Sequence, residues 1–276
     1  MRFIVGGITA FLLLVISIAL TISYIPLGTS GNSLPLVECQ KLWSPRGVYS
    51  TKEEQNSIES IRKAIELGAG GIEIDFYYEP VNDYFYLSHG EKTIEELDKM
   101  DKLVTLSQVV RLFPNAQFWF DYKNLGRLTD EETNKAIAYL AKLDQVSNIK
   151  NRVYIEASNP MILERYTQAG FYTLLAVDLL PEESLFSRVV AGFYKGVYFS
   201  FDVSAIAVRH GGLDKKKQVR YGYDTANILY SIPTFVFHVP DEEPLLKELV
   251  KLEQVKALLN GRDFSSNRFY LNTCPK

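Results

Sequence analysis

The sequence predicts an α/β fold: a (β/α)8 barrel of the TIM type, preceded by one N-terminal transmembrane helix. Short apolar segments and helical segments alternate along the soluble part, which gives eight strand–helix units. The short segments are continuously apolar, as parallel strands buried on both faces tend to be. A doubly wound open sheet is the alternative, but no Gly-rich phosphate loop follows the first predicted strand. A closed barrel is therefore the predicted architecture.

The first element is an apolar segment at the N-terminus. Residues 3–25 are almost wholly apolar, and no charged residue occurs before Glu38 once Arg2 is passed. As a helix, this segment is long enough to cross the hydrocarbon core of a bilayer, which is about 30 Å thick. The positive-inside rule then places the rest of the chain on the extracytoplasmic (periplasmic or extracellular) side. A cleaved signal peptide is the alternative; the thin positive region and the lack of a small-x-small site favour an uncleaved anchor.

Three regions follow from this reading: a signal-anchor helix at residues 1–28, a linker at residues 29–37 and a barrel at residues 38–276. Cys39 and Cys274 are the two cysteines of the chain, and they lie near the two ends of the predicted barrel region. A disulfide bond between them is one interpretation in an oxidising compartment, and two free thiols are the other.

The soluble elements follow in order. Asn56 is predicted to cap the first helix with Glu59 three residues later, Ile58 and Ile61 lie on one face of that helix, and Gly68 ends it. Residues 84–88 form a hairpin-like extended segment. The eight predicted strands are residues 36–43, 72–78, 117–122, 152–157, 172–177, 196–201, 234–239 and 255–259. Further helices are predicted at residues 105–113, 130–143, 160–168, 181–193, about 224–230 and 242–252.

A pair of acids and a histidine stand out in this series. Glu73 and Asp75 are two residues apart on one predicted strand, so their side chains project from the same face. The next extended segment leads directly to His89. Two stacked carboxylates repel each other and lose solvation unless a cation or a proton joins them. The pattern favours a metal site with a proton-transfer group beside it; a strand whose acids simply face water is the other reading.

In a barrel, the residues at the carboxyl ends of the strands converge on one mouth. The ring predicted here contains several acids, one arginine and one lysine, which suits a hard cation together with an anionic ligand. Oxygen ligands favour Mg²⁺ or Ca²⁺ over zinc. A net charge of −3 and the lack of a basic stripe in the sequence argue against a nucleic-acid binder. The predicted ring comprises Arg46, Glu73, Asp75, Asp121, Lys123, Glu156, Ser158, Asp178, Asp202 and His238.

Several segments, in their order along the chain, resemble the glycerophosphodiester phosphodiesterase family, one of the phospholipase-C-like phosphodiesterase barrels. The resemblance covers roughly residues 38–262. Pro45-Arg46-Gly47 falls where the family has His-Arg-Gly, and residues 68–75 are similar to its Gly-Ala-Asp-x-Ile-Glu-x-Asp. Residues 87–90 are similar to its Val-x-His-Asp. The family's Pro-Glu-Asn-Thr, Thr-Leu-x-Glu-Val-Leu and Glu-x-Lys motifs fall on residues 54–57, 105–110 and 121–123.

The resemblance implies a set of site residues. Glu73, Asp75 and Asp121 would hold one divalent cation, Mg²⁺ or Ca²⁺, that polarises a phosphodiester. Arg46 and Lys123 would hold the phosphate. In the family, two histidines act as general base and general acid, and His89 would be one of them.

The departures from the family pattern bear on activity. Pro45 replaces the first catalytic histidine and cannot transfer a proton. Gln55 and Asp121 stand where the family has glutamates, and Gly90 stands where it has an aspartate. His238, in the seventh predicted strand, is a candidate substitute within the mouth, and a histidine packed in the barrel is the other reading. Glu156 and His238 are also candidate additional metal-site residues. His210, in a polar segment, is expected to be solvated.

Two functions follow. The first is a membrane-anchored, divalent-metal-dependent phosphodiester hydrolase acting on glycerophosphodiesters or (lyso)phospholipid head groups. The alternative is a catalytically degenerate barrel that binds a phosphorylated ligand or a partner without turnover. The cluster of costly charged residues favours the enzyme, and the loss of the first histidine favours the alternative. In both cases the expected partners are a phosphodiester or phospholipid and the membrane, with no nucleic acid.

Overall fold

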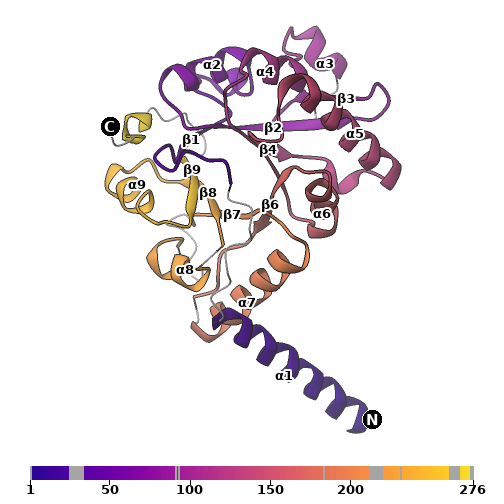
Figure 1. Cartoon of the computed structure of the whole chain (residues 1–276), viewed down its shortest axis with the longest axis vertical. Helices are drawn as coiled ribbons and strands as arrows, with labels where there is room; N and C mark the ends of the chain where they lie inside the picture. Colours follow the sequence, from indigo (N-terminus) through magenta and orange to yellow (C-terminus); the bar gives the residue numbers. More distant parts are fainter. Residues whose placement is uncertain are drawn as a thin grey trace.

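Eight parallel strands close into a barrel in the described part of this computed structural model (Figure 1). The structure describes residues 2–24, 34–90, 92, 94–182, 184–211, 220–230, 232–260 and 268–273. The sheet order is β1-β9-β8-β7-β6-β5-β4-β2, and β1 pairs with β2 to close it. The predicted barrel is confirmed. The strands are β1 (Leu42–Pro45), β2 (Ile72–Glu79), β4 (Phe118–Tyr122), β5 (Val153–Ala157), β6 (Tyr172–Val177), β7 (Ala205–Arg209), β8 (Thr234–Val239) and β9 (Val255–Asn260).

Helices surround this barrel, and one hairpin extends it. β3 (Tyr84–Leu87) pairs antiparallel with β2 and extends the sheet beyond the barrel. Thr105 and Thr129 open two of the helices with capping boxes, in which each side chain accepts a hydrogen bond from the third residue of its helix. The helices are α1 (Arg2–Tyr24), α2 (Ile58–Glu66), α3 (Ile94–Lys99), α4 (Leu106–Leu112), α5 (Asp130–Ser147), α6 (Pro160–Gln168), α7 (Ser184–Ser200), α8 (Tyr223–Ile228) and α9 (Glu243–Leu249).

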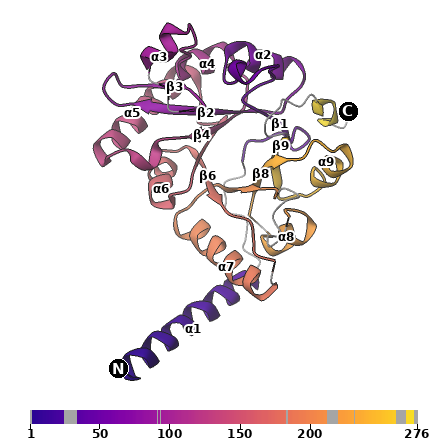
Figure 2. The ribbon, with the colours of Figure 1, turned by 180° about the vertical axis from the view of Figure 1, so that it is seen from behind.

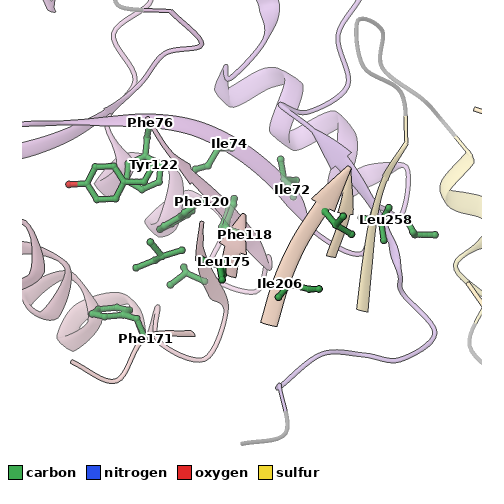
Figure 3. Packing of buried hydrophobic residues seen from close by; sticks show 14 of the residues in the cluster. Ile72, Ile74, Phe76, Phe118, Phe120, Tyr122, Phe171, Leu175, Ile206 and Leu258 are labelled. Carbon is green, nitrogen blue, oxygen red and sulfur yellow. The ribbon is translucent and has the colours of Figure 1, made fainter. Parts of the chain in front are cut away.

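The strands bury both faces, but the two faces meet different surroundings. Ile72, Ile74 and Phe76 of β2 point outward into the layer between the strands and the helices, as Figure 3 shows for this layer. The residues between them point into the barrel, because strand side chains alternate. A separate aromatic core fills the barrel interior below the mouth; it comprises Trp43, Trp119, Tyr154, Leu174, Ala205, Ala207, Phe235, Ala257 and Leu259.

One predicted strand is wrong. Of residues 196–201, the first five belong to α7, which runs to Ser200, and Phe201 follows it; the next strand is β7, at Ala205–Arg209. A short run of β-branched and aromatic residues fits a strand as well as a helix that is buried on most sides. Here α1 covers part of the outer face of α7, so the helix is apolar beyond its barrel side. Asp202 therefore lies before β7 and not at the mouth.

The start of the barrel also differs from the prediction. β1 begins at Leu42, and residues 36–41 form no strand. Ser57, not Asn56, caps α2, and it shares a capping box with Ser60. The Asn56 side chain instead forms hydrogen bonds with Asp75, as described below. The predicted helix end is confirmed, since Gly68 follows α2 with a φ of +88°.

The N-terminal segment is a helix, α1, which packs along α7 (Figures 1 and 2). Among the residues that the structure describes, no helix is both long enough and apolar enough to cross a bilayer. The transmembrane helix therefore remains a prediction from the sequence. Cys39 is disulfide-bonded, and its predicted partner, Cys274, lies outside the described residues. Nearby, the Asn272 side chain bonds the backbone of Leu42 at 2.8 and 2.9 Å.

His210 is buried, with 3% of its surface exposed, and is not solvated as predicted. It follows β7, and its Nδ1 lies 3.2 Å from the carbonyl oxygen of Gly211. The backbone amide of His210 donates to the Phe237 carbonyl at 2.8 Å, which places the residue against β8. Burial lowers the pKa of His210 below its ordinary value.

This burial predicts a pH-dependent loss of stability. Below the ordinary histidine pKa of about 6.5 the unfolded chain gains a proton that buried His210 resists, so the free energy of unfolding falls as the pH falls. His210→Gln should remove this component. Urea unfolding at about pH 7.5 and about pH 5.5 measures it: the loss between these two values should be smaller in the variant, and an equal loss would contradict the assignment.

Candidate active site

Neighbouring strands bring the predicted acids together at the carboxyl end of the barrel. The parallel register pairs Pro45 with Glu73, then Asp75 with Asp121, and Asp121 with Glu156. Because these residues alternate with the outward-facing ones, their side chains enter the barrel above its aromatic core.

Asp75 is the centre of the cluster. Its side chain is fully buried, and Arg46 Nε lies 2.7 Å from Asp75 Oδ2, while Lys123 Nζ lies 2.6 Å from Oδ1. His89 Nδ1 lies 3.1 Å from Oδ2. Asn56 donates from Nδ2 to the same oxygen at 2.9 Å and accepts the Asp75 backbone amide at 3.1 Å. Burial alone would raise the pKa of Asp75, but the bond from His89 and the charges of Lys123 and Arg46 hold that pKa well below its ordinary value.

The pKa values of the other three carboxyl groups are raised instead. Burial, followed by repulsion from Asp75, raises the pKa of Glu73 well above its ordinary value. Burial also raises the pKa of Asp121, although Lys123 pairs with it directly. Burial and the charge of Asp121 raise the pKa of Glu156 to about 8, and the Trp119 indole donates a hydrogen bond to Glu156 Oε2. The mouth therefore holds more carboxyl groups than its two cations neutralise.

The three predicted ligands fit a divalent cation. Glu73, Asp75 and Asp121 each offer an oxygen atom, and these atoms all lie within 4.8 Å of one another. A purely oxygen donor set of this charge suits Mg²⁺ or Ca²⁺. Among the described residues, Glu156 and His238, the additional candidates, are not part of this group. They line the cavity at the barrel mouth that is described below.

A strained turn presents Arg46. Its φ of +59° is in the left-handed region, which is unfavourable for residues other than glycine, asparagine and aspartate. Gly47 follows with a φ of +84°, and a Cβ atom there would lie 2.4 Å from the backbone of Ser60. Ser60 in turn donates from its hydroxyl to the Arg46 carbonyl at 3.1 Å. The first turn of α2 thus holds the turn that aims the guanidinium at Asp75.

Pro45 and His238 line one cavity of about 170 Å³ at the mouth. His238 has a φ of +55° near the end of β8, and its ring packs edge-on against Phe237 at 5.0 Å. The predicted substitute for the missing histidine therefore opens into the same space as the proline. The cavity is lined by Pro45, Arg46, Glu73, Trp119, Asp121, Lys123, Glu156, Phe237, His238 and Leu259.

A second cleft of about 450 Å³ adjoins this cavity and shares Asp121, Lys123 and Glu156 with it. Ser158, another predicted mouth residue, lines this cleft. Asp178 lines neither of the two spaces. The His89 side chain, 54% exposed, lies at the rim.

The sequence does not reveal the contacts of three residues at this site. Asn56 is predicted as a cap, although the resemblance places it on the asparagine of Pro-Glu-Asn-Thr, which is a usable signal. Gln55, noted only as a departure from the family pattern, accepts a hydrogen bond from Arg46 Nη1 at 3.4 Å. Trp119 was not singled out, because an aromatic residue in a strand usually reads as core.

The fold has solved counterparts. A protein assigned as a glycerophosphodiester phosphodiesterase from Galdieria sulphuraria superposes with a TM-score of 0.63, at 15% identity over 84% of this chain and 98% of that chain. A glycerophosphodiester phosphodiesterase from Agrobacterium tumefaciens gives 0.56 at 14% identity, over 84% and 99%. One from Parabacteroides distasonis gives 0.56 at 15% identity, over 80% and 92%. No protein-family model matches the chain, and no curated protein sequence matches it. The chain has the fold of these phosphodiesterases.

Removing one carboxylate tests the cation site. A cation at a hundred times its Kd stabilises a protein by about 2.7 kcal/mol, which is a rise of several degrees in Tm. Mg²⁺ or Ca²⁺ should raise the Tm of the unmodified protein and of the exposed control Glu95→Gln, but not that of Glu73→Gln. An equal rise in Glu73→Gln would show that the cation binds elsewhere.

Proposed function

We propose that this protein is a divalent-metal-dependent phosphodiester hydrolase acting on glycerophosphodiesters or on (lyso)phospholipid head groups. The observation that carries the proposal is the cluster around Asp75. Three carboxylates, Arg46, Lys123 and His89 converge at the mouth of a barrel whose solved counterparts are glycerophosphodiester phosphodiesterases.

The two positively charged side chains that line the mouth cavity, Arg46 and Lys123, suit phosphate binding. A cation held by Glu73, Asp75 and Asp121 would supply Lewis-acid polarisation of the phosphodiester. Arg46 and Lys123 line the same cavity and carry fixed positive charge, since the carboxylates beside them keep both pKa values above their ordinary range despite burial. They therefore orient the phosphate and stabilise the charge that develops on its oxygens.

His89 is the proposed proton-transfer group. Its Nδ1 faces the buried Asp75 carboxylate at 3.1 Å, which fixes the orientation of the ring. Nε2 is then the ring nitrogen that exchanges a proton with the attacking water or with the departing alcohol.

His238 is proposed as the second proton carrier. Pro45 cannot transfer a proton, and His238 lines the same cavity. The left-handed backbone of His238 supports a role at the mouth, because such strain is more often found at functional sites than in packed cores.

The proposal includes a membrane tether. Residues 3–25 carry no charge, and Arg2 precedes them, so the tethered barrel would lie on the extracytoplasmic side as a single-pass protein. A disulfide-bonded Cys39 supports such a compartment, because disulfides persist in oxidising surroundings.

Hydrolysis tests the central part of this proposal. The protein is assayed against a panel of glycerophosphodiesters and lysophospholipids with Mg²⁺ or Ca²⁺, with and without chelator. Turnover should require the cation and should fall by about 10²–10⁴-fold in His89→Ala, while cation binding persists. Gly90→Ala is the matched control, because a Cβ atom there meets nothing within 4 Å. Cation binding without turnover in the unmodified protein would instead favour the binding-only barrel.

A separate pair of variants tests His238. Asparagine tolerates the left-handed backbone at this position, so His238→Asn removes the proton carrier without the strain that other residues would add. It should lower kcat by about 10²–10⁴-fold, and Pro45→His should restore part of the rate. A kcat unchanged in His238→Asn would leave the ring as a packing residue only.

A further inference from the structure

α1 and α7 form an antiparallel pair on the outside of the barrel. Figures 1 and 2 show α1 lying against α7 at one end and projecting away from the barrel at the other. Tyr24 lies beside Arg188, whereas Ala19, earlier in α1, lies beside Gly192, later in α7. The carboxyl-terminal half of α1 therefore covers part of the outer face of α7.

The contact between the two helices is close at one point. A Cβ atom on Gly192 would lie 1.8 Å from the carbonyl oxygen of Ala19, so the backbones touch there. Gly196, four residues on, completes a Gly-xxx-Gly spacing but meets nothing within 4 Å. Small residues that allow such close approach are typical of helix pairs in lipid.

Two positively charged side chains of α7 contact the carboxyl-terminal end of α1. The buried Lys195 donates from Nζ to the Ser23 carbonyl at 2.8 Å, and the Arg188 guanidinium lies 4.5 Å from the centre of the Tyr24 ring. A lysine on a carbonyl at this end satisfies an otherwise unpaired acceptor and complements the helix dipole.

Most exposed residues of both helices are large and apolar. On α7, Phe193 and Phe199 are 45% and 41% exposed, and Leu185 and Phe186 are also exposed. Phe193 lines the same groove as Ile18 of α1, so the two apolar surfaces are continuous. α1 carries no charged residue after Arg2; a helix this apolar favours an apolar environment, and α7 covers only one side of it. The exposed aliphatic and phenylalanine residues of α1 are Ile8, Phe11, Leu12, Leu13, Leu14, Ile16 and Ile18; the small hydroxyl residues Thr9, Ser17 and Thr21 are exposed between them.

We propose that α1 and the outer face of α7 form one apolar surface that contacts the acyl-chain region of a lipid bilayer. The barrel itself, and not only its N-terminal segment, would then touch the membrane. The inference rests on the proposed membrane tether but not on the proposed hydrolysis, and it does not require α1 to cross the bilayer. A second copy of the chain is the competing occupant of the surface.

Fluorescence quenching by lipid tests the surface. Phe193→Cys is labelled with an environment-sensitive fluorophore in the full chain under non-reducing conditions, which preserve the bonded Cys39. The protein is reconstituted into phosphatidylcholine vesicles containing a spin-labelled lipid. Fluorescence should fall about twofold at position 193, as expected for a side chain within the acyl-chain boundary. Phe199→Cys is a second reporter on α7, and Val146→Cys on α5, where valine is 67% exposed, is the matched control.

Each outcome decides the proposal. Quenching at residues 193 and 199 but not at residue 146 supports it. Vesicle-bound protein in which residue 193 is quenched no more than residue 146 overturns it and leaves the α1 tether in place. Self-quenching between labels at residue 193, without lipid quenching, assigns the surface to a second copy. Protein that does not bind vesicles overturns both tether and surface; hydrolysis assayed on the same samples tests the enzyme separately.

Discussion

The burial of the Asp75 carboxylate is the constraint on which the site depends. A carboxylate with no exposed surface is strongly unfavourable unless it is paired and hydrogen-bonded. Four partners meet that need here, and each comes from a different part of the chain: the turn after β1, the segment before α2, the segment after β3, and the residue after β4. Removing one partner of a buried pair typically costs about 3–5 kcal/mol. The carboxylate therefore ties the first half of the barrel together as well as organising the chemistry.

Much of the fold and the centre of the site could be predicted because they depend on local patterns. Glu73 and Asp75 share a face by the geometry of any strand, and Asp121 joins them because neighbouring parallel strands end at the same mouth. Seven of the eight barrel strands were also predictable, since buried parallel strands leave continuous apolar runs. The resemblance to the phosphodiesterase family added the phosphate-binding roles that we propose for Arg46 and Lys123, which spacing alone does not reveal.

The remaining features depend on long-range contacts. The apolar pattern of residues 196–201 fits a strand, and it fits a helix only once the contact between α1 and α7 is known. Nothing in the segment itself predicts that contact. Asparagine is a good helix cap by residue type, but the Asn56 side chain hydrogen-bonds the buried carboxylate of Asp75, 19 positions away. His210 sits in a polar sequence, yet the contact of β7 with β8 buries it. In each case a distant element overrides a local preference.

The cation site can be tested directly by a crystal structure of the protein with bound Mn²⁺, which replaces Mg²⁺ or Ca²⁺ and scatters anomalously. We expect one anomalous peak within ligand distance of carboxylate oxygens of Glu73, Asp75 and Asp121, with Arg46 still paired to Asp75. A saturated crystal with no peak among these three residues, or with its peak elsewhere in the barrel mouth, would contradict the proposed cation site.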